Sequence, residues 1–289
     1  MSSLPVETVA GLAAGFGTTP LAHPLDLLKL RLQLDTHRTS QWQACKRILS
    51  SINKNGNGTL VNLYRGIGPN IIGSTSAWGL YFFFYRHYKD LLIANSHSLE
   101  NDNYLQPHHY LGTAFAAGAS TAILTNPIWV VKTRMLATDR SSPGAYTSFL
   151  NGLYNIYKLE GLRGYYRGLV PALLSVSQGA VQLSLYDIIK KSLGPDNDTS
   201  SIHYLYASAL SKMVATCIFY PLQTIRSRLQ ASTTHAHNSP ISVLLNIVRY
   251  EGPLAVYKGL PANLLRVVPA TCTTFLIYEH VKSNLVNIL

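Results

Sequence analysis

The chain has 289 residues, of which 47% are hydrophobic and 13% are charged, and its 24 Lys and Arg against 13 Asp and Glu give a formal net charge of +11. Charged residues usually make up about a quarter of a soluble domain, so this composition argues against an ordinary soluble protein. An intrinsically disordered chain is excluded as well, because 18 Tyr, 8 Phe and 3 Trp can bury a large apolar surface.

Several segments approach the length of a membrane-spanning helix, which needs about 20 predominantly apolar residues. In chain order they are Val6 to Leu34, Asn70 to Leu92, His109 to Leu136, Pro171 to Leu193, Ile202 to Leu229 and Asn263 to Leu285. A buried soluble helix bundle is the alternative interpretation, but it requires more charge on the outward faces. The sequence therefore predicts an all-α membrane protein with six transmembrane helices. Only five residues precede the first segment, and we expect no cleavable leader.

The links between these segments differ in charge. Residues 35–68, 137–169 and 231–260 hold 5, 4 and 2 Lys or Arg, whereas residues 91–108 and 192–202 hold none. The short links instead carry Glu100, Asp102, Asp196 and Asp198. Because basic links stay on the inner side of a membrane, the three long links are predicted to lie together there, with both termini on the outer side.

The chain contains three copies of one pattern, which divide it into repeats 1–96, 97–196 and 197–289. The first motif begins at a proline, Pro24, Pro127 or Pro221, and has a basic residue five positions later. About forty residues further on, an aromatic-basic-glycine step ends at Gly66, Gly168 and Gly259, and a third motif begins at Tyr85, Tyr186 and Tyr278. Three such copies in register are very hard to obtain by chance.

This threefold pattern resembles the mitochondrial carrier family, the family of the ADP/ATP carrier, over essentially the whole chain. The resemblance implies six tilted helices around a pseudo-threefold axis, with short surface helices in the inner links. It also implies a monomer that works by alternating access in the inner mitochondrial membrane, with both termini toward the intermembrane space. We see no phosphate-binding glycine loop, no Ser-His-Asp arrangement and no metal cluster, so we expect no enzyme, cofactor or metal, and no nucleic-acid partner.

The proline motif is predicted to form a gate on the matrix side. Pro24, Pro127 and Pro221 should bend the odd-numbered helices and draw their inner ends toward the axis. In the family, an acid two residues after each proline pairs with a base five residues after another, and these positions here read Asp26, Lys29, Trp129, Lys132, Gln223 and Arg226. Asp26 with Lys132 is then the one intact ion pair. Gln223 can only hydrogen-bond Lys29, and Arg226 is expected to face the indole of Trp129, so the gate should be weak.

The third motif is predicted to form the cytoplasmic gate. Its positions read Arg86, Lys89, Asp187, Lys190, Glu279 and Lys282. We expect Asp187 to pair with Lys282 and Glu279 with Lys89, whereas Arg86 should repel Lys190. Exposed pairs contribute only about 0 to 1 kcal/mol each, so such a gate can open readily. Interfacial snorkelling of these charged side chains is the alternative interpretation.

The glycine steps stand where an inner link enters an even-numbered helix, and a helix start offers free N–H groups to an anion. In the family such positions bind cardiolipin. The resemblance therefore implies lipid headgroups at Gly66, Gly168 and Gly259, and an ordinary surface turn is the alternative.

A substrate lacks threefold symmetry, so its contacts should lie where equivalent positions differ. Residues seven beyond the step glycines read Gly73, Ser175 and Arg266, which the resemblance identifies as the main contact points. Arg266 can hold a phosphate or carboxylate with two hydrogen bonds, and Gly73 leaves room for a flat ring. The full set of expected substrate-binding residues is Gly73, Ala77, Trp78, Ser175, Val176, Lys212 and Arg266. Lys212 replaces the small Gly15 and Gly118 of the other repeats, and its alternative is a lysine that reaches for the interface.

Within the family, the aromatic stretch from Trp78 to Tyr85 is similar to the flavin and folate carriers, and Trp129 also occurs among NAD and pyrimidine-nucleotide carriers. The aromatic run suits a stacked ring system, and lipid-facing bulk is its alternative. We expect transport of FAD or a related flavin, with folate, NAD or another nucleotide as the runner-up. An alternative of another class is a membrane scaffold or proton leak that has lost transport.

Overall fold

The computed structural model of the protein describes residues 4–54, 59–95, 107–140, 142, 144–192, 201–233, 239–267 and 273. Every regular element in these ranges is helical. The long helices are α1 (Leu4–Leu34), α4 (Ile67–Asn95), α5 (Pro107–Ala137) and α10 (Ser201–Ala231). A further long helical stretch consists of α8 (Leu169–Leu174), a 3-10 turn (Ser175–Ser177) and α9 (Gln178–Ser192). Residues 260–267 are also helical.

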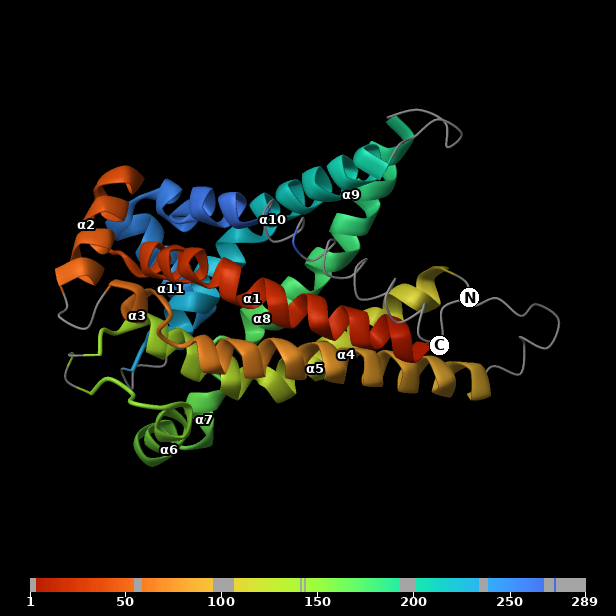
Figure 1. The fold of residues 1–289 in the computed structure, drawn as a ribbon, viewed down its shortest axis with the longest axis horizontal. Coiled ribbons are helices and arrows are strands. Elements are labelled where there is room, and N and C mark those ends of the chain that lie inside the picture. Colours follow the sequence, from red (N-terminus) through yellow and green to blue (C-terminus); the bar gives the residue numbers. More distant parts are fainter. Residues whose placement is uncertain are drawn as a thin grey trace.

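Short helices occupy the three long links. They are α2 (Gln41–Lys54), α3 (Thr59–Leu63), α6 (Phe149–Glu160), α7 (Leu162–Tyr165) and α11 (Pro240–Asn246), followed by a π-helical turn (Ile247–Glu251) and a 3-10 turn (Pro253–Tyr257). Figure 1 shows α2, α3, α6, α7 and α11 gathered at one end of the molecule, which we call the link end, while the long helices extend away from it. The three basic links therefore lie together, as their charge predicts.

Two of the described helical stretches are long and apolar enough to cross a membrane, His108–Ala137 and Leu162–Ser192. Helices α1, α4 and α10 occupy three more of the predicted segments and have 31, 29 and 31 residues. The sixth predicted segment, Asn263–Leu285, lies mostly outside the described residues. The helix predicted from Pro171 to Leu193 is present up to Ser192, the last described residue there, and contains the 3-10 turn, at which Val176 packs onto Gly118. A Cβ at Gly118 would lie 2.6 Å from Val176 Cγ1, so only glycine permits this approach of the two helices.

The repeated prolines lie inside α1, α5 and α10, and the residue before each one makes an equivalent bond. The Nε2 atom of His23 lies 2.9 Å from the carbonyl oxygen of Arg65. Asn126 Nδ2 donates to the Arg167 carbonyl at 3.3 Å, and Tyr220 Oη donates to the Lys258 carbonyl at 2.9 Å. Helices α1, α5 and α10 are thus each tied to the glycine step of their own repeat, and each uses a different type of side chain.

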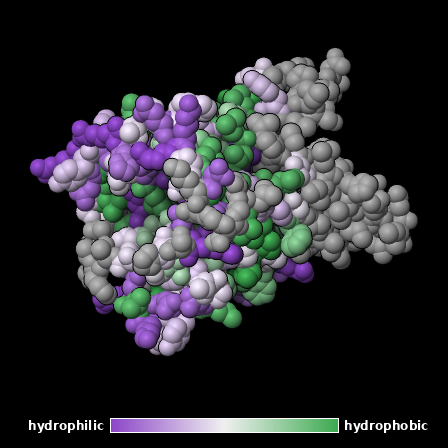
Figure 2. Space-filling view, turned by 60° about the vertical axis from the view of Figure 1, so that its left-hand side comes forward, coloured by the Kyte–Doolittle hydropathy of each residue, from purple (hydrophilic) through white to green (hydrophobic). Residues whose placement is uncertain are grey.

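The apolar core is concentrated at the link end. Each link contributes one isoleucine that is almost fully buried against the long helices. These residues are Ile52, Ile156 and Ile247. Large apolar side chains such as Phe83, Leu183 and Ile218 on the long helices are instead more than half exposed. In Figure 2 hydrophilic side chains cover much of the link end and hydrophobic surface follows toward the middle, which suits a molecule whose middle faces lipid.

Candidate functional site

A cavity of 680 Å³ lies between the long helices on the side of their proline motifs. It collects most of the residues that the sequence selects as gate or substrate contacts. Those in its lining are Asp26, Lys29, Ala77, Trp78, Trp129, Lys132, Ser175, Val176, Gln223, Arg226 and Arg266. Gly73 and Lys212 do not line it. Positions far apart in the sequence therefore meet around one space.

Asp26 holds two cations at the floor of this cavity. Its Oδ2 lies 3.7 Å from Lys132 Nζ, and its Oδ1 lies 3.2 Å from Arg266 Nε. Arg266 Nε makes no hydrogen bond within the described part of the molecule, although it is buried, so its contact with Asp26 is an ion pair. The predicted pair with Lys132 is present, and the contact with Arg266 is one that the motif spacing did not indicate.

Neutral side chains complete the neighbouring gate positions. Lys29 Nζ donates to Gln223 Oε1 at 3.0 Å, and Gln223 Nε2 donates in turn to Gln178 Oε1 at 3.2 Å. The neutral amide of Gln223 therefore accepts one hydrogen bond from the ammonium of Lys29. A carboxylate at this position would form an ion pair with the same ammonium, which is a stronger contact.

The expected contact of Arg226 with Trp129 is not formed. The cation over the indole of Trp129 is Lys132, with its Nζ 5.0 Å from the ring centroid. Lys132 follows Trp129 by three residues on the same helix face, so it reaches the ring more easily than a side chain on another helix. Arg226 lines the cavity, and no hydrogen bond or ion pair joins it to another described residue.

Gly73 has a different role from the one expected. It is buried, and a Cβ there would lie 3.4 Å from two indole atoms of Trp129 and 3.2 Å from Ile128 Cγ2. The space that we expected for a substrate ring is thus filled by Trp129. Lys212 is half-buried on α10 beside the cavity region, without a hydrogen bond or ion pair to another described residue. Its role as a substrate contact stays a prediction.

At the opposite ends of the helices, three described residues of the predicted cytoplasmic gate contact other side chains and not one another. Arg86 pairs with Asp90 on its own helix at 3.8 Å, so its charge is not directed at Lys190 as expected. Lys89 Nζ lies 5.5 Å from the ring centroid of Tyr110, and Lys190 Nζ lies 5.3 Å from that of Tyr204. Glu279 and Lys282 are outside the described residues, and Asp187 makes no ion pair with a described residue.

Sequence reasoning missed the two tyrosines, although a signal was present. Tyr110 and Tyr204 both stand seventeen residues before a repeated proline. Each belongs to the helix that follows the lysine along the chain, α5 for Lys89 and α10 for Lys190. The same contact is therefore made twice in register.

A second feature that the sequence analysis missed joins α1, α5 and α10 into a closed ring at the link end. The arginine that stands seven residues after each repeated proline donates its Nε to a backbone carbonyl of the next of these three helices. Arg31 donates to Leu136 at 3.2 Å, Arg134 to Gln230 at 3.0 Å and Arg228 to Gln33 at 2.9 Å. Each donor stands seven residues after its proline and each acceptor nine residues after its own, so the repeat pattern contained this signal as well.

Two glutamates hold this ring in place. Glu160 accepts two hydrogen bonds from Arg134, at 2.6 and 3.0 Å, and pairs with Arg167 at 2.7 Å. Glu251 likewise forms ion pairs with Arg228 and with Lys258, and its carboxylate oxygen lies 2.8 Å from Lys258 Nζ. Burial acts to raise the pKa of Glu251, but the hydrogen bonds and charges of Arg228 and Lys258 outweigh it and hold that pKa below its ordinary value.

The first repeat has no such glutamate, since its lead-in reads Asn57-Gly58, outside the described residues. Arg31 instead pairs with Asp139 at 2.5 Å, and Arg65 donates to the Met135 carbonyl at 2.6 Å. Both partners belong to the second repeat.

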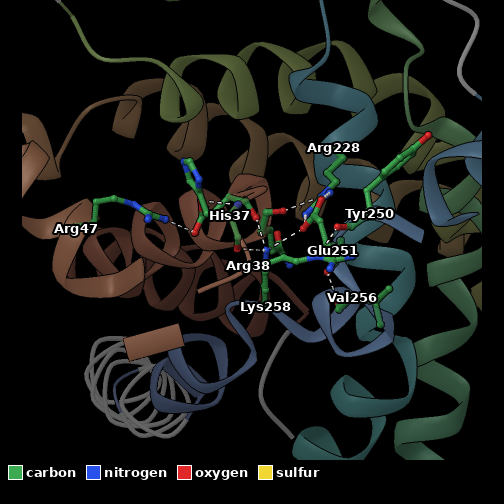
Figure 3. A network of polar contacts seen from close by, with 11 residues as sticks. His37, Arg38, Arg47, Arg228, Tyr250, Glu251, Val256 and Lys258 are labelled. Carbon is green, nitrogen blue, oxygen red and sulfur yellow. Dashed lines mark hydrogen bonds and ion pairs between the residues drawn. The ribbon is translucent and has the colours of Figure 1, made fainter. Parts of the chain in front are cut away.

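Figure 3 shows the corresponding junction between the first and third repeats. Lys258 Nζ donates to the carbonyls of Asp35 and His37, at 2.7 and 3.0 Å, and Arg38 Nε donates to the Tyr250 carbonyl at 2.7 Å. The links thus close the ring by backbone contacts as well as by ion pairs.

The step glycines are required by the backbone. Gly66, Gly168 and Gly259 have φ of +75°, +72° and +82°, a region that favours glycine. A Cβ at Gly259 would also lie 2.9 Å from the Lys29 carbonyl. A separate cavity of 520 Å³ beside Gly168 is lined by Arg163 and Arg167, with Ser239 from the third repeat. Among the described residues no cluster of His, Cys, Asp or Glu could hold a metal ion.

Comparison with known proteins agrees with the threefold pattern. The sequence profile of the mitochondrial carrier protein family matches residues 2–96, 104–197 and 197–289. The mitochondrial FAD carrier protein of Saccharomyces cerevisiae is 37% identical over 96% of this chain and 96% of its own length. The chloroplastic folate transporter 1 of Arabidopsis thaliana is 37% identical, covering 95% and 94%. The chloroplastic nicotinamide adenine dinucleotide transporter 1 of that plant is 34% identical, covering 97% and 92%. The chain belongs to the mitochondrial carrier protein family, whose members are transporters.

Proposed function

We propose that this protein transports FAD or a related flavin nucleotide across the mitochondrial inner membrane by alternating access. The observation that carries the proposal is the charge of the 680 Å³ cavity. Among the described residues, four cations line it, Lys29, Lys132, Arg226 and Arg266, against the single carboxylate of Asp26. A cavity with this excess of positive charge favours an anionic substrate, and Arg226 is free of any described counter-ion that a substrate would have to displace.

The charge of the substrate narrows the choice among nucleotides. The pyrophosphate of FAD is doubly negative, and folate carries two carboxylates, whereas the cationic nicotinamide ring of NAD cancels one of its charges. The excess of cations therefore favours FAD or folate over NAD. The likeness to the yeast protein named as an FAD carrier supports FAD as the first candidate, and folate is the second, supported by the plant relative named as a folate transporter.

The proposal includes an arrangement in the membrane. Six helices span it in three repeats, 1–96, 97–196 and 197–289, with the link end toward the matrix and both termini toward the intermembrane space. The protein acts as a monomer. Cardiolipin headgroups bind beside Gly66, Gly168 and Gly259, and the arginines that line the cavity next to Gly168 support an anionic headgroup there.

The gates follow from the same geometry. Asp26 with Lys132 and Lys29 with Gln223 close the matrix side, while Lys89 and Lys190 lie away from each other on the cytoplasmic side. Substrate then enters from the cytoplasmic side and meets Arg266, Ser175, Val176, Ala77 and Trp78, with Lys212 nearby. No covalent chemistry and no resident cofactor enter this scheme, because FAD is the cargo.

The test is uptake of labelled FAD into liposomes that contain the purified protein. FMN, riboflavin, folate, NAD and ADP serve as competitors, and liposomes without protein and with Arg266→Ala serve as controls. FAD uptake with strong competition by FMN or FAD and weak competition by riboflavin is the expected result. If only folate or only NAD is taken up, that compound replaces FAD as the assigned substrate. If well-folded protein takes up none of these anions, the result favours a membrane scaffold without transport.

A further inference from the structure

A second chamber adjoins the charged cavity. It has a volume of 860 Å³ and lies between α4, α5, α9 and α10. Trp78 and Val176 line both chambers, so the two adjoin. Along α5 the combined lining extends from Leu111 to Leu136, which at 1.5 Å per residue is about 38 Å. The space therefore suits an elongated substrate.

The chemistry of this upper chamber differs from that of the lower one. No Asp, Glu, Lys or Arg occurs among its described lining residues. Aromatic rings from three helices face it instead, namely Trp78, Tyr81, Phe115 and Tyr186. Gln182 and Ser211 add amide and hydroxyl groups at its walls. An apolar space with aromatic faces and a few polar groups is typical of a binding site for a flat heteroaromatic ring.

The aromatic run of α4 is divided between two faces of the helix. Trp78 and Tyr81 line the chamber, whereas Phe82 and Phe83 do not and are 51% and 63% exposed. Trp78 stacks on Phe82 at 5.7 Å and meets Tyr81 edge-on at 6.5 Å, so its indole is held from both sides. Trp78 is itself 50% exposed, so lining of the chamber, and not exposure, is what separates it from Phe82.

We propose that the upper chamber binds the flat ring system of the substrate, with Tyr81 and Phe115 as specificity-determining residues. This inference rests on the proposed function. The anionic groups of the substrate lie below, toward Arg266, and the isoalloxazine ring of a flavin nucleotide lies above, against Trp78 and Tyr81. Stacking of a base on an aromatic side chain strengthens binding by about five-fold or more, which is enough to select among anions of equal charge.

The first experiment compares two truncations with a matched control. Tyr81→Leu and Phe115→Leu should each raise the KM for FAD uptake roughly ten-fold, by the loss of one stacking partner. Phe83→Leu removes an aromatic ring from the same helix outside the chamber and should leave the KM within about two-fold, as should Tyr81→Phe, which keeps a ring. Inhibition by inorganic pyrophosphate, which has no ring, should be the same in all four variants.

The second experiment measures binding without transport. FMN fluorescence should be quenched on binding to the parent protein, because a stacked indole or phenol quenches a flavin, and Tyr81→Leu should weaken this binding while the inhibition constant of inorganic pyrophosphate is unchanged. Equal effects of Tyr81→Leu and Phe83→Leu on KM and quenching would overturn the inference. If the parent protein carries folate or NAD and not FAD, the proposed function is wrong about the substrate. The inference about the chamber is then tested with the same variants and the KM of the substrate that is carried.

Discussion

The guanidinium of Arg266 lies 3.2 Å from the carboxylate of Asp26, the same carboxylate that pairs with Lys132. One acid therefore contacts both a proposed substrate-contact residue and a proposed gate residue. If an anionic substrate binds Arg266, it should compete with Asp26 for the guanidinium and loosen one of the contacts at the cavity floor. The proposed function thus predicts that substrate charge is coupled to the gate.

The first prediction follows from the charge of Arg266. Arg266→Ala should lower FAD uptake at least ten-fold, because a close charge pair is worth up to about 4 kcal/mol at an effective dielectric constant of 20, before desolvation is subtracted. Riboflavin has the same ring without phosphate, so its weak competition should change little. Liposome uptake with both compounds measures this, and an equal loss for the two would show that Arg266 does not act through charge.

The second prediction concerns reversal of the gate pair. Asp26→Asn should reduce transport, and reversal of both partners, Asp26→Lys with Lys132→Asp, re-forms the pair with its ends exchanged. The structure limits the recovery, since a lysine at position 26 would then face Arg266. We expect the double variant to recover little of the lost melting temperature, and the triple variant with Arg266→Gln to recover more. The melting temperature without substrate is the measurement, because Arg266→Gln itself impairs uptake. Full recovery in the double variant alone would contradict the contact between Asp26 and Arg266.

The third prediction strengthens the matrix gate. Gln223→Glu is nearly isosteric and converts the hydrogen bond with Lys29 into an ion pair, so the closed gate should become more stable. The melting temperature should rise and the uptake rate should fall. Gln43→Glu makes the same change of charge on the exposed face of α2, where the side chain accepts from the Ser40 amide at 3.4 Å, so it should raise the melting temperature only slightly and leave the uptake rate unchanged. A faster carrier with an unchanged melting temperature would count against this contact as a gate element.

The pairs inside one repeated motif could be predicted, because helical register fixes which positions share a face. Asp26 with Lys132 and Lys29 with Gln223 follow from the proline spacing and the pairing order of the family. The contact of Arg266 with Asp26 could not, since it joins residues of two different motifs and depends on how far the first and last helices approach. Register also does not determine a rotamer, which is why Trp129 turned out to fill the space at Gly73 and to lie beneath Lys132.

The overall fold was predictable to a similar degree. Composition and the repeats indicate long helices with basic links at one end, and the described residues show that arrangement. The 3-10 turn at Ser175–Ser177 was not indicated, because it arises where Val176 meets Gly118 on another helix. The tyrosines at 110 and 204 were visible as a repeat, but nothing in their sequence context showed that a lysine would lie on each ring.

The fourth prediction concerns acid pH and Glu251. Its pKa is lowered in the folded protein from an ordinary value of 4.5, so its contacts stabilise the fold above that value and are lost as the pH falls below it. Glu251→Gln should therefore lower the melting temperature at pH 7 and should differ less from the parent as the pH falls into the acid range. Melting curves of both proteins across this range measure the difference. A gap that is constant with pH would mean that the carboxylate charge does not contribute.

The last prediction concerns the lysines of the cytoplasmic gate, which lie on Tyr110 and Tyr204 and not on each other. A cation over an aromatic ring is attracted by about 0.5 to 1 kcal/mol at exposed sites, so each contact should stabilise the state in which this side is open. Closure on that side requires both lysines to leave their rings. Tyr110→Leu and Tyr204→Leu should therefore lower the melting temperature without substrate and favour the closed form, while Tyr110→Phe should have a smaller effect, since the phenyl ring still attracts a cation. A double-mutant cycle with Lys89→Met isolates the contact: once the lysine is absent, Tyr110→Leu should no longer lower the melting temperature by the same amount. If the two changes are additive, the ring at position 110 supports the helix by packing alone and does not hold the gate lysine.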